Sequence, residues 1–134
     1  MRGTDGKWGE PIRVSADPNV AHWNPVLFQN DDGTITLYFK VGKDTEYWKT
    51  YYSVSTDGKN WAAPRELVPG DNSGGRGPVK NKPIRLKNGT ILAPGSTSSA
   101  ANTDASLTYR PTTARPGTEL PKSIRAFSGS SKFR

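Results

Sequence analysis

The chain has 134 residues, of which only 32% are hydrophobic, and it contains 14 Gly, 11 Pro, four Trp and a formal net charge of +7. This size fits one ordinary domain, and a composition poor in core residues but rich in turn residues favours short strands over a helical bundle. With no Cys and with His22 as the single His, disulfides, thiolate sites and zinc sites built from several His are excluded, and we expect no metal or cofactor.

No apolar run approaches the roughly 20 residues needed to span a bilayer. The N-terminal stretch MRGTDGKWGE also carries no apolar segment typical of a signal peptide. These observations predict no membrane span, and they leave localisation and oligomeric state open.

The positive charge is concentrated near the C-terminus. Residues 1–102 hold 13 basic and 10 acidic side chains, whereas residues 103–134 hold six basic and two acidic ones. A nucleic-acid-binding domain gathers its basic residues on one face or stripe. Because the charges in the body are mixed along the predicted strands and turns, we expect no nucleic-acid partner. Were the chain such a binder, removing residues 103–134 would abolish binding.

Alternating runs of β-branched and aromatic residues, separated by Gly-containing turns, indicate short strands throughout the body of the chain. The turn NDDG joins the first two strands as a hairpin, because Asp-Gly tolerates a positive φ. The loop DNSGGRG then interrupts the series before the pattern restarts. The predicted strands are residues 24–29, 34–41, 49–55, 64–68, 82–86 and 90–94.

Two turns of similar sequence occur along the chain, TDGKW at residues 4–8 and STDGKNW at residues 55–61. Asp5 and Asp57 lie 52 residues apart, and a repeat of about 50 residues built from four short strands is typical of a propeller blade. The sequence therefore predicts an all-β chain organised as repeated antiparallel blades.

The composition of the second turn suggests how it is stabilised. Asp57 can accept hydrogen bonds from backbone N–H groups just after it, and Gly58 supplies a positive φ. Ser55 can bond across the turn, while Trp61 can cover the apolar layer of the blade. We therefore interpret Ser55, Asp57, Gly58 and Trp61 as a structural set.

The turn STDGKNW resembles the Asp-box of sialidases, with one residue fewer between Asp and Trp than is usual. The segments HWNPVLFQNDDGTITLYFKVG, WKTYYSVSTDGKNWAAPREL and GPVKNKPIRLKNGTILAPGS are similar to consecutive segments of the sialidase-like BNR-repeat family. The resemblance covers about residues 4–97. It implies a six-bladed β-propeller, of which this chain would form about two four-stranded antiparallel blades.

The resemblance also implies an activity. Sialidases of the family are exo-glycosidases that bind the sugar carboxylate with three arginines, use a Tyr polarised by a Glu as nucleophile, and use an Asp as acid/base. None of these roles can be assigned to a residue of this chain. Asp5 fits the turn motif better than the acid/base role, and the blade that holds Tyr47, Tyr51 and Tyr52 is the wrong one for the nucleophile. Arg76 and Arg85 lack the signature of the three arginines. The catalytic residues of this chain are therefore left unassigned.

We accordingly expect this chain to be part of a sialidase-like glycoside hydrolase of the exo-α-sialidase type, inactive by itself. Such an enzyme removes terminal sialic acid or a related sugar from glycoconjugates. The alternative is a non-catalytic glycan-binding or structural propeller module. Glycan affinity without hydrolysis would favour that alternative.

Two polar triplets open the inner strands of the two blades and are the candidate substrate-binding residues. Lysine charge suits a carboxylate, amide groups suit hydroxyls, and an aromatic ring suits the apolar face of a sugar. The competing interpretation is that the Asn residues cap strand starts, the Trp packs between blades and the Lys side chains are solvated. The candidates are His22, Trp23, Asn24, Lys80, Asn81 and Lys82. Lys40 is predicted to be a solvated strand end.

Residues 98–134 are expected to form an irregular basic tail outside the blade domain of residues 1–97. In the next reading frame, YRPTTARPG is compatible with codons for STDNGQTW, an Asp-box whose Asp falls 55 residues after Asp57. This spacing supports the hypothesis that the tail is out-of-frame translation of a further blade. The alternative is a natural disordered tail.

Overall fold

A computed structural model of the chain describes residues 2–15, 17–74, 76–98, 103–110 and 122–125. It contains two four-stranded antiparallel sheets, each with its strands in chain order. The first sheet comprises β1 (His22–Gln29), β2 (Ile35–Val41), β3 (Lys49–Ser55) and β4 (Arg65–Glu66), with the 3-10 turn η1 (Thr45–Tyr47) before β3. The second sheet comprises β5 (Ile84–Arg85), β6 (Ile91–Ser98), β7 (Thr103–Arg110) and β8 (Lys122–Arg125). The predicted all-β class with two blades is confirmed.

The hairpin between β1 and β2 forms where the sequence predicted it. Gly33 has a φ of 81° and its N–H donates to the Asn30 carbonyl at 3.0 Å. The Asp32 carboxylate accepts from the Thr34 N–H at 2.9 Å, which completes the turn. Local turn chemistry is sufficient to fix this connection, and for that reason it could be read from the sequence.

The apolar core of the described residues is small. The buried hydrophobic side chains are Val26, Phe39 and Ala93. Several polar side chains in the first sheet are buried as well, and these are Thr36, Lys40, Thr50, Ser53 and Ser55. Buried polar groups must be hydrogen-bonded. The cohesion of this sheet therefore depends on polar contacts as well as on apolar burial.

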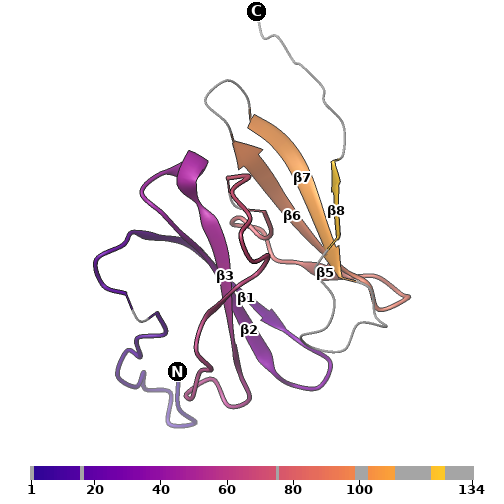
Figure 1. Cartoon of the computed structure of the whole chain (residues 1–134). Helices are drawn as coiled ribbons and strands as arrows, with labels where there is room; N and C mark the ends of the chain where they lie inside the picture. The colour runs from indigo at the N-terminus through magenta and orange to yellow at the C-terminus, as the bar shows by residue number, and fades with distance from the viewer. Residues whose placement is uncertain (1, 16, 75, 99–102, 111–121, 126–134) are drawn as a thin grey trace, which may run out of the picture.

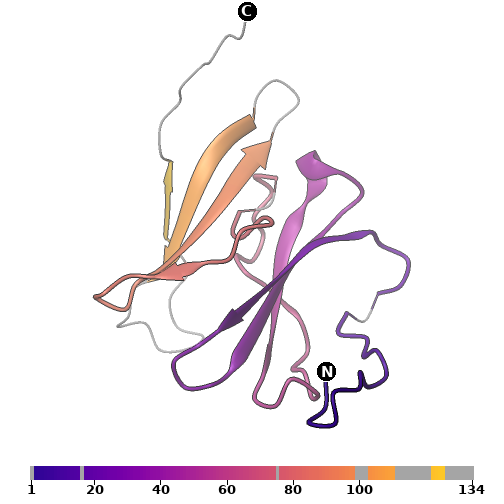
Figure 2. The same ribbon diagram turned by 180° about the vertical axis from the view of Figure 1, so that it is seen from behind.

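The two sheets lie side by side, and the connection from β4 to β5 runs between them (Figures 1 and 2). The Arg85 side chain of the second sheet joins them: its Nε lies 2.9 Å from the Asp31 carboxylate of the first hairpin. The same guanidinium lies 5.7 Å from the centre of the Phe28 ring. At the other end of the first sheet, η1 contacts β6.

Two details differ from the sequence-based expectation. The fourth and fifth strands are only two residues long, since β4 is Arg65–Glu66 and β5 is Ile84–Arg85. Two strands, β7 and β8, lie within the region expected to be irregular, and β7 pairs along the whole of β6. The alternation of apolar and polar residue types in TDASLTYR is itself typical of a strand.

The division of the chain at residue 97 stays a prediction, and β6 continues through it to Ser98. The out-of-frame hypothesis covers the tail of residues 98–134 and stays a prediction; residues 99–102, 111–121 and 126–134 of this tail lie outside the described residues.

Candidate functional site

The antiparallel register separates the two sequence motifs of the first sheet. Val41 at the end of β2 pairs both with His22 at the start of β1 and with Lys49 at the start of β3. The opposite end carries Ser55, the last residue of β3, and the turn that follows it. The candidate triplet of the first blade and the Asp-box therefore lie at opposite ends of the sheet. The first of these is called the aromatic end below and comprises residues 20–24 and 41–49.

The Asp-box is closed by its own hydrogen bonds. One oxygen of the Asp57 carboxylate accepts from the N–H groups of Lys59 and Asn60 at 2.8 and 2.7 Å, and the other accepts from the Asn60 side-chain amide at 2.7 Å. These donors, the Asn60 N–H first, hold the pKa of Asp57 well below its ordinary value. The Ser55 hydroxyl accepts from the Gly58 N–H at 2.8 Å, and Gly58 has a φ of 70°.

Both carboxylate oxygens of Asp57 are therefore occupied by hydrogen bonds within the turn. Ala62 N–H then donates to the Val54 carbonyl at 2.9 Å, which returns the chain to the sheet, and Trp61 is half-buried beside it. The earlier turn repeats part of this pattern, because the Asp5 carboxylate accepts from the Lys7 N–H at 3.1 Å. Its Trp8, in contrast, is 78% exposed, so the apolar packing of the two turns differs.

The side chains of the first triplet are anchored to nearby backbone. The Nδ1 of His22 lies 2.6 Å from the Val20 carbonyl, and its Nε2 lies 2.5 Å from the Ser15 hydroxyl. Because a carbonyl can only accept, Nδ1 is the donor in its contact with Val20. Asn24 has a φ of 48°, and the register shifts between Trp23 and Val26, so a bulge re-aims the start of β1.

Trp23 presents an exposed ring at the aromatic end. Its indole N–H donates to the Gly42 carbonyl at 2.8 Å, and 42% of the residue remains exposed. The ring packs on Trp48, with centroids 6.1 Å apart. Gly42 lets the backbone of Tyr47 and Trp48 lie close to the end of β2: its φ is 148°, and an added Cβ would lie 2.6 Å from the Tyr47 carbonyl oxygen.

Tyr47 extends this surface, since it is 59% exposed and the Lys43 ammonium lies 5.0 Å from its ring centre. The aromatic end thus combines three aromatic rings with a cation. Sequence reasoning missed Trp48 as a site residue. The signal was present, because Trp48 stands directly before the predicted strand 49–55 and at the same end as Trp23.

The second triplet lies on the connection that leads into β5. Lys80, Asn81 and Lys82 are exposed, and Lys80 has a φ of 61°. The preceding Val79 donates its N–H to the Pro94 carbonyl of β6 at 3.3 Å. Since η1 also contacts β6, a segment of the aromatic end and the residue before the second triplet both lie against this strand. Among the described residues, no hydrogen bond or ion pair joins one triplet directly to the other.

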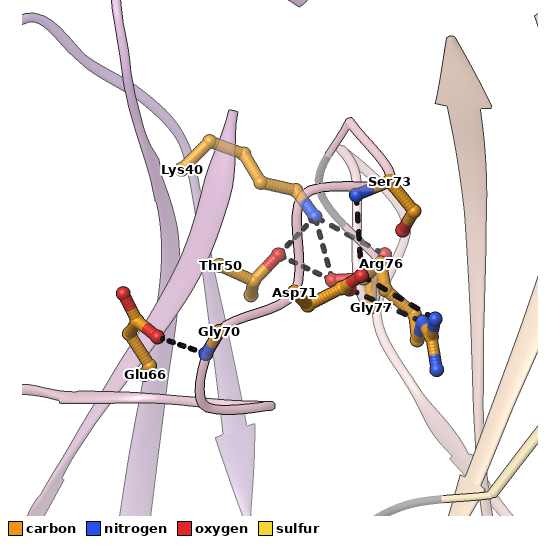
Figure 3. A network of polar contacts seen from close by, with 8 residues as sticks. All are labelled: Lys40, Thr50, Glu66, Gly70, Asp71, Ser73, Arg76 and Gly77. Atoms are coloured by element: carbon orange, nitrogen blue, oxygen red, sulfur yellow. Dashed lines mark hydrogen bonds and ion pairs between the residues drawn. The ribbon is translucent and has the colours of Figure 1, made fainter. Parts of the chain in front are cut away.

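The prediction of Lys40 as a solvated strand end is wrong. The residue is 0% exposed, because the loop between β4 and β5 covers it (Figure 3). Its ammonium nitrogen lies 2.6 Å from the Thr50 hydroxyl and 3.1 Å from the Arg76 carbonyl. Sequence alone does not reveal this contact, because Lys40 and Arg76 are 36 residues apart.

A search of the described residues finds no cluster of His, Asp and Glu side chains suited to a metal ion. The same part of the chain has no helix that is both long and apolar enough to cross a membrane.

The model of the BNR repeat-like domain matches residues 1–116 of the chain. The chain belongs to the BNR repeat-like domain family. The match confirms the resemblance drawn from the Asp-box and the strand segments, and it extends beyond residue 97, where that resemblance was expected to end. No curated protein matches the chain, and no solved structure matches it.

One tyrosine–carboxylate pair of this BNR repeat-like chain has the composition that sialidase chemistry requires. The Tyr51 hydroxyl donates to the Glu66 carboxylate at 3.2 Å, and the Lys49 ammonium lies 3.2 Å from the same oxygen. Burial, together with the Glu66 charge, raises the pKa of Tyr51. A raised pKa disfavours the tyrosinate that a nucleophile needs.

The carboxylate of this pair is also committed elsewhere. Its second oxygen accepts from the Gly70 N–H at 2.8 Å, which holds the pKa of Glu66 below its ordinary value. Tyr51 and Glu66 are direct register partners of β3 and β4. The pair therefore acts as a cross-strand link that stabilises the short outer strand.

Proposed function

We propose that this BNR repeat-like chain supplies a glycan-contacting surface to a sialidase-like glycoside hydrolase of the exo-α-sialidase type. Its substrate would be terminal sialic acid or a related sugar acid on a glycoconjugate, and the chain alone would not hydrolyse it. One observation carries the proposal: η1 at the aromatic end and Val79 beside the second triplet both contact β6. This shared strand supports placing the aromatic rings and the lysine charge on one surface.

The chemistry of the two triplets fits the two faces of a sugar acid. An exposed indole such as Trp23 offers a flat apolar surface for the C–H face of a pyranose. Lys80 and Lys82 are exposed ammonium groups that attract a carboxylate. Family membership supports the sialidase-like class, and the use of Tyr51 and Glu66 as a cross-strand link supports the absence of hydrolysis by this chain.

Tryptophan fluorescence of the full chain, titrated with N-acetylneuraminic acid, tests the binding. We expect a saturable change that Trp23→Ala abolishes, with the exposed Trp8→Ala as matched control. Lys82→Gln should weaken binding and reduce its salt dependence, whereas Lys59→Gln, at the opposite end of the sheet, should not.

The neutral sugar N-acetylglucosamine should bind more weakly, because it lacks the carboxylate. Release of 4-methylumbelliferone from its sialoside should stay at background. Binding without hydrolysis by an assembly that holds every blade would favour the non-catalytic glycan-binding module. No binding to any sugar acid, or equal binding by Trp23→Ala, would contradict the proposal.

A further inference from the structure

Lys40 holds backbone from a different part of the chain. Its nitrogen, buried between β2 and the loop, lies 2.6 Å from the Thr50 hydroxyl on β3, 3.1 Å from the Arg76 carbonyl and 3.5 Å from the Gly77 carbonyl (Figure 3). The Thr50 hydroxyl itself donates to the Arg76 carbonyl. One amine and one hydroxyl thus connect the first sheet to residues 76–77.

Two backbone bonds hold the ends of the loop: the Leu67 N–H donates to the Thr50 carbonyl of β3 at 2.7 Å, and the Val79 N–H donates to the Pro94 carbonyl of β6 at 3.3 Å. The polar contacts of its middle part, apart from those to Lys40 and Thr50, are internal or reach β4. The Arg76 guanidinium faces the Asp71 carboxylate with N···O distances of 3.2 and 3.4 Å, and the Ser73 N–H donates to the same carboxylate at 3.2 Å. These bonds shape the loop. They do not determine where it lies on β2 and β3.

The close approach of the loop depends on a glycine. Gly77 has a φ of 100°, and an added Cβ would lie 2.6 Å from a Leu67 methyl and 3.4 Å from the Thr50 methyl. The positive φ favours glycine at this position, and any side chain here would also have to displace the Leu67 methyl.

Both halves of the proposed glycan surface meet at this residue. The backbone of Lys40 pairs directly with that of Trp23 in the β1–β2 register. Its side chain binds the carbonyls of residues 76–77, from which the chain runs through Val79 to Lys80, Asn81 and Lys82. Lys40 is therefore the point at which the placement of one triplet is coupled to that of the other.

We propose that Lys40 is a positioning residue that sets the place of residues 80–82 relative to Trp23. This role rests on the proposed glycan surface. A buried amine is costly unless oxygens satisfy it, so the loop conformation that brings two carbonyls to Lys40 is favoured. An apolar side chain at this position would leave those carbonyls without a donor and release the loop.

Hydrogen exchange of the full chain, read by mass spectrometry, tests this role. Lys40→Met should accelerate exchange in residues 70–82 about tenfold while leaving residues 35–41 and 49–55 protected. The chain has no cysteine, so Lys40→Cys introduces a unique thiol. Alkylation with 2-bromoethylamine in denaturant, followed by refolding, restores an amine at lysine length and should restore protection of the loop.

Alkylation of the same thiol with 1-bromopropane gives a side chain of equal length without the amine. This control should leave the loop unprotected, because a purely packing role would be rescued by either reagent. Equal rescue by both reagents, or an unchanged loop in Lys40→Met, would overturn the assignment. Where Lys40→Met does not fold, Thr50→Val removes one contact to the loop and should also accelerate hydrogen exchange in residues 70–82. Unchanged exchange of the loop in Thr50→Val would likewise contradict the assignment.

Titration of the same proteins with N-acetylneuraminic acid separates the two proposals. Binding by the wild type that weakens about tenfold in Lys40→Met and returns with the aminoethyl group supports both. Wild type that does not bind overturns the proposed function, and the exchange data then decide whether Lys40 holds the loop. Binding that is unchanged in Lys40→Met despite a released loop overturns the positioning role alone.

Discussion

Buried Lys40 makes the stability of the folded chain depend on pH near neutrality. Burial lowers the pKa of Lys40 from 10.5 to about 7, while the negative charge of Asp71 opposes the shift. Arg76, which lies in the same loop, is paired with Asp71. The perturbation is a change of pH from 6 to 9, applied to the wild type and to Lys40→Met.

The sign follows from which state holds the proton. In the unfolded chain Lys40 keeps its proton up to its ordinary pKa of 10.5, whereas the folded chain loses it near 7. Between these values the unfolded state binds more protons, so the free energy of unfolding rises with pH, by at most about 1.4 kcal/mol per unit. The gain from pH 7 to 9 is then up to about 3 kcal/mol, a large part of the roughly 5–15 kcal/mol typical of a domain. The neutral amine keeps two N–H donors for the loop carbonyls.

Urea unfolding followed by tryptophan fluorescence measures this free energy at each pH. Burial and the Glu66 charge raise the pKa of Tyr51, so its hydroxyl stays protonated up to pH 9 and does not add to the slope in this window. We expect the wild type to become more stable from pH 7 to 9, and the slope due to Lys40 to vanish toward pH 6, where both states hold its proton. In Lys40→Met this slope should be absent. Equal slopes in the two proteins, or a wild type that loses stability over this window, would refute the reasoning.

Three further predictions concern the Asp-box, the outer strand and the C-terminal region. Asp57→Asn should lower the melting temperature by a few degrees at pH 7. The difference between the melting temperatures of the variant and the wild type should shrink below the ordinary Asp57 pKa of 3.8, as acid protonates the wild-type carboxylate. Circular dichroism melts at pH 7 and at a pH below 3.8 check this. An equal deficit in acid would contradict the role assigned to the carboxylate. Tyr51→Phe should cost about 1 kcal/mol in urea unfolding yet leave sugar binding unchanged, whereas a loss of binding would place Tyr51 in the glycan surface. Reading the coding DNA from codon 90 onward should reveal an open shifted frame that encodes further strands and Asp-boxes, and early stop codons in that frame would rule out the out-of-frame hypothesis.

Much of the first sheet was predictable because its determinants are local. The strand at residues 49–55 has the predicted bounds, and the first hairpin forms around its Asp-Gly turn. Such turns are specified by the φ preference of glycine and by side-chain carboxylates that bond to the next N–H groups. The second sheet was predicted less well, because β7 and β8 lie in the tail that was expected to be irregular, and the alternation of residue types in β7 was overlooked.

The repeat of Asp-box turns and strand segments by itself determined the family, the all-β class and the two-blade arrangement. What only the tertiary structure decided is which polar groups meet. Lys40 was expected in solvent because its neighbours in sequence say nothing about a loop more than thirty residues away. The pairing of Trp23 with Trp48 and the docking of residues 76–77 arise from register and from backbone approach at Gly77. Contacts of this kind depend on how separate segments pack, and a linear pattern of residue types carries no record of them.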